Sequence, residues 1–209
     1  SETDSDAVGT SITLFLNENG SEYTNRWSIQ DIVKKYSNHI SFPIFLHFTE
    51  EKTDDKENTT VEDKIEQINA ASAFWKQSKS SLKAEDYNSF YTSIGNDYQE
   101  PMFYIHTQAE GSLDYTTLFY IPQNAPQDMY QPDYAAGVKL YVKRVFITDD
   151  EKELMPTYLR FLRGVIDTED LPLNVSREIL QQNKILSKIR TNSVKKVLSE
   201  FKSMTTDVD

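Results

Sequence analysis

The stretch MFYIHTQAEGSLDYTTLFYI, residues 102–121, holds two runs of β-branched and aromatic residues joined by a short EGS link. Such residues favour strands, and a three-residue link that contains glycine suits a hairpin. We therefore predict an antiparallel pair formed by residues 102–108 and 113–121. A third run, VKLYVKRVFIT at 138–148, has the same character and predicts one long central strand.

Helical patterns flank these strands. Residues 84–97 and, most clearly, residues 184–202 carry apolar side chains at helical spacing. Pro156 opens a further predicted helix, which runs to about Arg163 and ends at Gly164. Strands with helices before and after them predict a layered α/β domain.

A smaller strand–helix–strand unit comes earlier, at residues 9–49. The run TSITLFL alternates as a strand, SIQDIVKKYSNHI predicts a helix capped by Ser28, and SFPIFLHFT predicts a second strand. Such a unit is too small to bury its own apolar face. The almost wholly polar segment 50–66 is typical of a linker that forms a solvated loop, and the main domain is expected to begin near residue 67.

The composition limits the class of protein. With 209 residues, of which 38% are apolar, the chain is long enough for one large domain and a fragment of another. The formal net charge of −11 argues against a general nucleic-acid binder, because phosphate contact needs a basic surface. The absence of cysteine excludes a disulfide framework and fits a reducing compartment, and no apolar run approaches the roughly 20 residues that span a bilayer. The chain starts at Ser1 without a signal pattern, and we expect it to be a piece of a longer protein.

The run LPLNVSREILQQNK, residues 171–184, places Arg177 in the first turn of a predicted helix. A helix N-terminus carries partial positive charge, so an arginine there is expected beside an anion such as a phosphate. Gln181 lies four residues on, and therefore on the same helical face. The alternative is a surface arginine that pairs with a neighbouring carboxylate: Glu169, Asp170 or Glu178. Taken alone, the residue pattern favours this alternative.

Trp75 lies in the polar-flanked segment FWKQSK. An isolated tryptophan in such a segment is often partly exposed, and it offers a large contact area to a partner. The alternative is an indole folded back onto its own domain, and the pattern leaves both interpretations open.

Other polar side chains predict no further chemistry. The three histidines, His39, His47 and His106, are scattered without the spacing of metal ligands, so we predict no metal site. The acidic pair Glu169–Asp170 stands before a predicted helix, where capping explains it better than carboxylate catalysis.

A longer run, RVFITDDEKELMPTYLRFLRGVIDTEDLPLNVSREILQQNK at 144–184, resembles the middle domain of the heat-shock protein 90 chaperone family, and most nearly its bacterial high-temperature protein G branch. The resemblance continues in FYTSIGNDYQEP (90–101), LFYIPQNAPQDMY (118–130) and IRTNSVKKVLSEF (189–201). Upstream, GTSITLFL (9–16) and IVKKYSNHISFPI (32–44) are similar to the end of that family's N-terminal domain. Nearly all of the chain is covered.

The resemblance implies an α/β (α+β) fold with a three-layer α-β-α middle domain, preceded by a strand–helix–strand remnant of the N-terminal ATPase domain. It divides the chain into this remnant at 1–49, a charged linker at 50–66, and the large α/β subdomain of the middle domain at 67–209. The full-length protein is expected to be a cytoplasmic homodimer, with no nucleic-acid or membrane partner.

The resemblance also implies an ATP-dependent molecular chaperone whose partners are unfolded or partly folded client proteins. ATP, with magnesium, is expected to bind mainly to the N-terminal domain, so this fragment alone should hold no cofactor and should be inactive as an ATPase. SRE at 176–178 matches the family motif whose arginine contacts the γ-phosphate, which assigns that role to Arg177. Gln181 matches a companion residue of the same catalytic loop, and Trp75 matches a client-contacting tryptophan. The competing hypothesis is a non-catalytic protein-interaction module.

Overall fold

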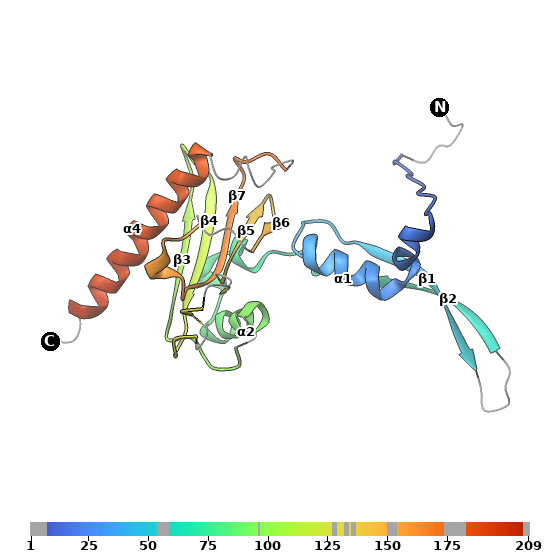
Figure 1. Cartoon of the computed structure of the whole chain (residues 1–209), viewed down its shortest axis with the longest axis horizontal. Helices are drawn as coiled ribbons and strands as arrows, with labels where there is room; N and C mark the ends of the chain where they lie inside the picture. Colours follow the sequence, from blue (N-terminus) through green and yellow to red (C-terminus); the bar gives the residue numbers. More distant parts are fainter. Residues whose placement is uncertain are drawn as a thin grey trace.

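The computed structural model describes residues 8–53, 59–95, 97–126, 129–131, 134, 137–149, 154–173 and 183–206. These residues form a five-stranded sheet with helices packed on it, and a separate two-stranded ribbon (Figure 1). The mixed α/β class predicted from the sequence is therefore confirmed. None of the described helices combines the length and the hydropathy needed to cross a membrane.

The five-stranded sheet has the order β3-β4-β7-β5-β6. Its strands are β3 (Phe103–Ala109), β4 (Tyr115–Ile121), β5 (Gly137–Val142), β6 (Val145–Thr148) and β7 (Arg163–Thr168). All neighbours are antiparallel except β5 and β7, which are parallel. The predicted hairpin at 102–121 is confirmed, with Phe103 of β3 opposite Ile121 of β4.

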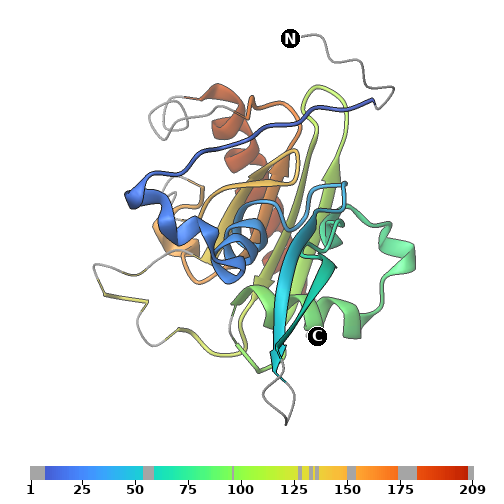
Figure 2. The ribbon, with the colours of Figure 1, turned by 90° about the vertical axis from the view of Figure 1, so that its right-hand side faces the viewer.

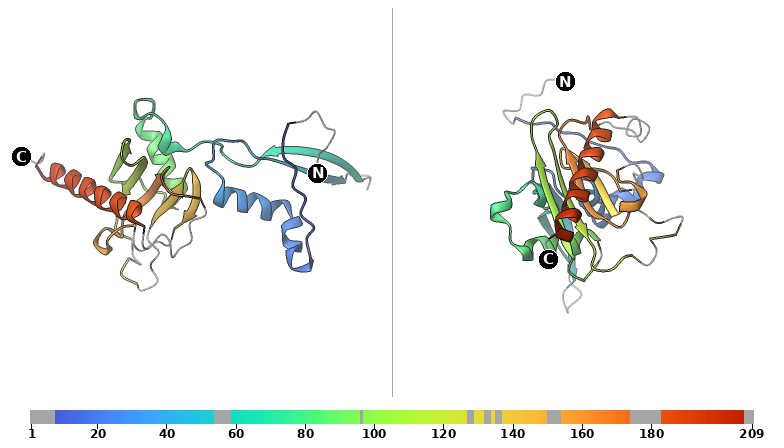
Figure 3. Two further views of the ribbon diagram at one scale, coloured as in Figure 1. Left: turned by 90° about the horizontal axis from the view of Figure 1, so that it is seen from above. Right: turned by 90° about the vertical axis from the view of Figure 1, so that its left-hand side faces the viewer.

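A helix covers each face of this sheet, α2 (Ala84–Gly95) on one side and α4 (Lys184–Thr206) on the other (Figure 1). The right-hand view of Figure 3 looks directly onto α4 lying across the strands. Strand β4 is buried along its whole length and contributes side chains to the hydrophobic clusters on both faces of the sheet. Its Leu118 and Tyr120 pack with α2, whereas Phe119 and Ile121 pack in the cluster that contains α4. The two helices predicted at 84–97 and 184–202 are confirmed.

The single long strand predicted at 138–148 is wrong, because the chain turns in its middle. Lys143 and Arg144 have φ angles of 51° and 67°, the left-handed conformation that a two-residue hairpin turn requires. Strands β5 and β6 are therefore antiparallel neighbours, with Val142 opposite Val145. No glycine, asparagine or aspartate marks this turn, so the usual sequence signal is missing.

The helix predicted from Pro156 to Arg163 is also wrong. Only η4 (Thr157–Leu159) is helical, and Arg163 already begins β7. Gly164 ends no helix, since it lies inside this strand with φ at 141°. A Cβ atom there would lie 2.0 Å from the carbonyl oxygen of Leu118. Glycine at this position therefore permits the close approach of β7 to β4.

The N-terminal part projects from the sheet and comprises η1 (Glu18–Thr24), α1 (Arg26–Tyr36), β1 (Phe45–Thr53) and β2 (Thr59–Gln67). Figure 2 faces this end of the molecule. Helix α1 starts earlier than predicted, because the side chain of Asn25, and not Ser28, accepts the capping hydrogen bond from the backbone of Trp27.

Two further expectations for this part need correction. Residues 59–66, predicted as part of a solvated loop, pair with β1 along its whole length, and Lys64 forms an ion pair with Glu50 across the two strands. The polar side chains of this segment are mostly exposed, and α1 contacts one face of the ribbon through Arg26 and Gln30. Residues 9–16, predicted as a strand, are extended but pair with no strand of the described chain, and Ile12 is 80% exposed.

Candidate functional site

Arg177 and Gln181 lie outside the described residues, which stop at Leu173 and resume at Asn183. The structure does describe the chain that leads to them. Strand β7 ends at Thr168, and Leu171 beyond it is buried in the core cluster that contains α4. We call residues 167–171 the approach segment.

The approach segment is tied to the β3–β4 hairpin through Asp114. The backbone N–H of Glu169 donates to the carbonyl oxygen of Asp114 at 3.1 Å, and the hydroxyl of Thr168 donates to the same oxygen at 3.1 Å. In return, the backbone N–H of Asp114 donates to a carboxylate oxygen of Asp170 at 2.7 Å. The pair Glu169–Asp170 therefore joins two loops, and the start of the helix that it was predicted to cap lies outside the described residues.

Trp75 lies in the short helix η2 (Phe74–Lys76) and has no exposed surface. Its indole N–H donates to Oδ2 of Asp167 at 2.8 Å. Oδ1 of Asp167 accepts from the backbone N–H of Arg144 at 3.1 Å. Of the two interpretations that the sequence left open, an indole folded back onto its own domain is therefore the one that describes this conformation.

Asp167 is as deeply buried as Trp75. Burial raises the pKa of this carboxyl group, because the charged form loses its hydration, while the two N–H donors act in the opposite direction. Lys76, the next residue of η2, adds a second link, an ion pair of 3.0 Å with Glu169, which lies two residues beyond Asp167. Consecutive residues of η2 therefore hold alternate residues of the approach segment.

His106 extends this buried network towards α2. Its Nε2–H donates to the carbonyl oxygen of Trp75 at 2.8 Å, and its Nδ1 accepts from the hydroxyl of Tyr87 at 2.8 Å. Burial lowers the pKa of His106, so the ring is neutral and both ring nitrogens have partners. His106 acts as a structural residue, and within the described residues no three histidine or acidic side chains gather as a metal site would require.

The junction between α1 and β1, residues 37–44, is held by Asn69. Its side chain accepts from the backbone N–H of Ile44 at 2.8 Å and donates to the carbonyl oxygens of Phe42, at 2.9 Å, and Ser37, at 3.3 Å. A single amide thus satisfies three backbone groups.

His39 of the same junction lies against Trp75. The two rings meet edge to face with centroids 4.7 Å apart, and Nδ1 of His39 donates to the carbonyl oxygen of Ser72 at 3.0 Å. Desolvation lowers the pKa of His39, which keeps the ring neutral. The junction is therefore in direct contact with the buried indole.

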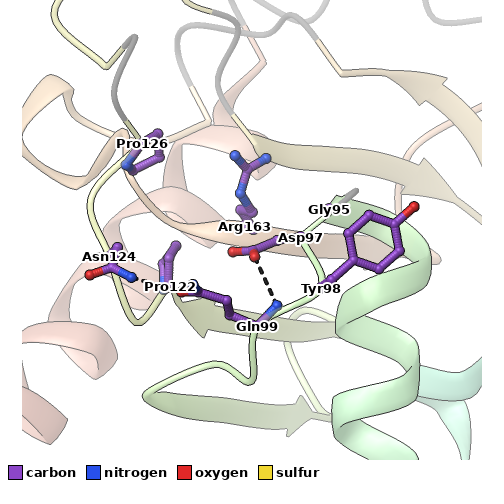
Figure 4. A pocket seen from close by; sticks show the side chains of 8 residues that line it. All are labelled: Gly95, Asp97, Tyr98, Gln99, Pro122, Asn124, Pro126 and Arg163. Carbon is purple, nitrogen blue, oxygen red and sulfur yellow. Dashed lines mark hydrogen bonds between the residues drawn. The ribbon is translucent and has the colours of Figure 1, made fainter.

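A separate hollow of about 360 Å³ opens beside β7, with Arg163 and Asp97 at its centre (Figure 4). Asp97 accepts from the hydroxyl of Tyr91 at 2.6 Å and from the backbone of Gln99 at 3.1 Å. The hydrogen bond from Tyr91 lowers the pKa of Asp97, so the carboxylate stays ionised. Arg163 and Asp97 therefore place opposite charges in the same hollow.

Comparison with known proteins agrees with the resemblance. The family model described as "Hsp90 protein" matches residues 49–209, well over half of the chain. This chain belongs to the Hsp90 family. The Hsp90 chain is 63% identical over 199 residues to the "Chaperone protein HtpG" of Treponema denticola, covering 95% of this chain and 31% of that relative. It is 60% identical over 210 residues to the protein of the same name from Helicobacter pylori strain 26695, covering 99% of this chain and 34% of that relative.

The Hsp90 chain thus spans about a third of the length of these curated relatives. Within it, sequence reasoning missed Asp167 and Asn69. Asp167 is the charged residue of the run RGVIDT that packs inside the sheet, and the β-branched neighbours that precede it were a usable signal of a buried strand. Asn69 carried no signal, because its three partners lie far from it in sequence.

Proposed function

We propose that this chain is part of an ATP-dependent molecular chaperone and supplies the arginine that contacts the γ-phosphate of ATP. The role falls on Arg177, with Gln181 as a companion polar residue. Membership of the Hsp90 family, together with the sequence SRE at 176–178, carries the proposal. The full-length protein would act in the cytoplasm as a homodimer that binds unfolded or partly folded proteins.

The chemistry suits an arginine. Negative charge spreads over the γ-phosphate oxygens as the phosphoryl group leaves ADP, and a guanidinium group donates several N–H bonds in a fixed plane to such oxygens. Placed there, Arg177 would stabilise the transition state more than bound ATP.

The contacts of two neighbouring carboxylates favour this role over the alternative, a surface arginine that pairs with an acidic neighbour. Glu169 and Asp170 were candidate partners for a surface arginine, but each has a partner in its own domain. Glu169 pairs with Lys76 at 3.0 Å, and Asp170 accepts from the backbone of Asp114 at 2.7 Å. Both carboxylates of the approach segment therefore already have partners, and neither is the first partner expected for Arg177.

ATP is the substrate in this proposal, and magnesium would come with it. On the basis of family membership, we propose that residues outside this fragment bind the nucleotide and that the fragment alone is inactive. The assignment of 1–49 as N-terminal remnant and of 67–209 as three-layer middle subdomain belongs to the same proposal, as does 50–66 as a linker whose described residues lie in the β1–β2 ribbon. A sheet with a helix on each face supports it.

The segment around Trp75 is proposed as part of the client surface. Since the indole is buried, direct contact with a client requires η2 to open. Phe74 beside it is only partly buried and stacks on Phe90 with ring centroids 4.8 Å apart, so an aromatic surface is present without any opening.

Steady-state ATPase kinetics of the full-length protein test the role of Arg177. Arg177→Ala should lower kcat by roughly 10³-fold or more while KM for ATP stays nearly unchanged, and Arg190→Ala on α4 is a matched control. Wild-type turnover in Arg177→Ala would sink the assignment. A pure loss of ATP affinity would move the role from the transition state to the ground state.

A second candidate is a non-catalytic interaction module, which the exposed aromatic side chains Tyr98 and Tyr130 favour, at 91% and 85% exposure. The two candidates are separated by adding the isolated N-terminal domain in trans to this chain. Stimulated ATP hydrolysis that depends on Arg177 supports the catalytic role, and its absence together with retained client binding supports the interaction module.

A further inference from the structure

We propose that the hollow beside β7 binds an acidic segment of a partner protein, with Arg163 as the contact for its carboxylate. The hollow, of about 360 Å³, lies between residues 97–99, which follow α2, and residues 122–126, which follow β4. Arg163 begins β7 and lies between these two loops (Figure 4). The proposal is independent of the role of Arg177.

Two glycines leave room for the stem of Arg163. A Cβ atom on Gly95, the last residue of α2, would lie 3.2 Å from Cδ of Arg163. A Cβ atom on Gly137, the first residue of β5, would lie 2.8 Å from its Cγ. The stem is therefore packed between two backbone segments, and the side chain is half-buried instead of extending freely into solvent.

The guanidinium group of Arg163 has no bonded acceptor in the part of the chain that the structure describes, and its Nε atom is buried. The carboxylate of the same hollow, Asp97, accepts instead from the hydroxyl of Tyr91 and from the backbone N–H of Gln99. Figure 4 shows the guanidinium group extending away from Asp97, with no bond between the two. A half-buried cation has lost part of its hydration, and a carboxylate that accepts two parallel N–H bonds replaces it well.

The walls of the hollow match a peptide attached to that carboxylate. Pro122 and Pro126 form an apolar side, and the ring of Tyr98 is 91% exposed. The side-chain amide of Asn124 donates to the side-chain oxygen of Gln99 at 2.7 Å. This bond leaves an amide oxygen on Asn124 and amide N–H groups on Gln99 for a peptide backbone. An extended segment would thus place its carboxylate on Arg163 and its backbone beside the two amides.

Asp97 limits the charge of such a segment. The hydrogen bond from Tyr91 lowers the pKa of Asp97, so its carboxylate is ionised. Like charges in one hollow repel each other. Once Arg163 is paired with one incoming carboxylate, any further acidic group would meet the charge of Asp97 unopposed. We therefore expect a single acidic residue with uncharged neighbours, and not an acidic run.

Calorimetric titration of the full-length protein tests the site. The probe is a short peptide, blocked at both ends, whose only charge is one aspartate. Arg163→Gln should weaken its binding roughly tenfold or more, because a charge-assisted pair is lost. Asp97→Asn should tighten it about threefold at low salt, because a like charge is removed while the amide oxygen still accepts a hydrogen bond. A purely structural role of the two residues predicts no such opposite signs.

Arg160→Gln is the matched control. Arg160 is also close to the start of β7, but its guanidinium group lies 4.9 Å from the ring centre of Tyr134 and donates to the carbonyl oxygen of Gln131 at 3.5 Å. This variant should bind the probe as the wild type does. Arg177→Ala should also bind it normally, so the site and the proposed function fail separately.

Unchanged affinity in Arg163→Gln, or equal binding of a probe with asparagine in place of aspartate, would overturn the site. If Arg163→Gln does not fold, Asp97→Asn decides, and weaker or unchanged binding there overturns the site. Two further ligands test the source of the carboxylate. Stronger binding of an uncharged peptide with a free C-terminal carboxylate, or succinate binding as tightly as the probe, would overturn the assignment to an acidic side chain within a segment.

Discussion

The carboxylate of Asp167 accepts the indole N–H of Trp75 at 2.8 Å, and neither side chain is exposed to solvent. The bond joins two residues separated by much of the chain and fixes η2 on the central strand β7. It also means that a residue predicted to contact clients lies inside the domain, next to the strand that leads to Arg177.

Fluorescence quenching measures this burial directly. The chain has two tryptophans, and Trp27 is 59% exposed whereas Trp75 is fully buried. In the Trp27→Phe variant, acrylamide should quench the remaining emission weakly, and in Trp75→Phe it should quench it strongly. In the Trp27→Phe variant, an unfolded client that reaches Trp75 after η2 opens should change this weak quenching by acrylamide. Equal quenching of the two variants would contradict the buried indole.

Two glycines with positive φ allow the stability cost of a steric clash to be compared with the cost of backbone strain alone. Gly164→Ala places a Cβ atom 2.0 Å from the carbonyl oxygen of Leu118, so the variant should lose about 3 kcal/mol or more of unfolding free energy, or fail to fold. Gly111, at φ 128° in the β3–β4 link, has no atom within 4 Å of the added Cβ, and Gly111→Ala should cost about 1 kcal/mol. Urea unfolding of both variants checks the order, and equal losses would refute the steric explanation.

Much of the fold was predictable where the composition or the spacing of a single segment determines its structure. The β-branched and aromatic runs of β3 and β4 and the helical spacing of α2 and α4 depend on local pattern, and each element appeared as expected. The β5–β6 turn was not predictable, because Lys143 and Arg144 adopt left-handed conformations that neither residue favours. Gly164 was wrongly predicted to end a helix for a related reason. Glycine is needed there because β7 passes close to β4, and a local sequence pattern does not contain that contact.

The site was predictable to a smaller extent. Arg177 could be suspected from helix electrostatics and assigned by resemblance, but the polar flanks of Trp75 left open whether its indole is exposed or buried. Its burial depends on Asp167 and His39, which come from a distant strand and a distant junction. Contacts between segments far apart in sequence decide whether a polar-flanked aromatic is exposed, and no single-sequence pattern encodes them.

Asn69→Ala should loosen the junction. The change leaves the backbone N–H of Ile44 and the carbonyl oxygens of Phe42 and Ser37 without their partner, at a cost of about 2–4 kcal/mol. Limited proteolysis should then cut within residues 37–44 faster than in the wild type. Asn124→Ala removes an exposed bond to Gln99 and should leave the cleavage rate unchanged. A junction that resists protease in Asn69→Ala would show that the amide does not hold it.

The buried histidines make stability depend on pH. His39 and His106 both have a pKa below the ordinary value of 6.5, so between the lowered pKa and 6.5 the unfolded chain binds more protons than the folded chain. The free energy of unfolding therefore falls as the pH drops below about 6.5, by at most about 1.4 kcal/mol per pH unit for each ring. Asp167, whose pKa is raised, acts in the opposite direction nearer its own range, because its burial becomes less costly once it is protonated.

His106→Gln isolates one of these rings. The glutamine amide can still donate to the carbonyl oxygen of Trp75 but does not titrate, so unfolding midpoints in urea at about pH 7.5 and about pH 5.5 should differ less than in the wild type. His47→Gln, at an exposed position of β1, should keep the wild-type difference. A wild-type pH dependence in His106→Gln would mean that the ring is charged in the folded chain, and that its bond to Tyr87 runs in the reverse direction.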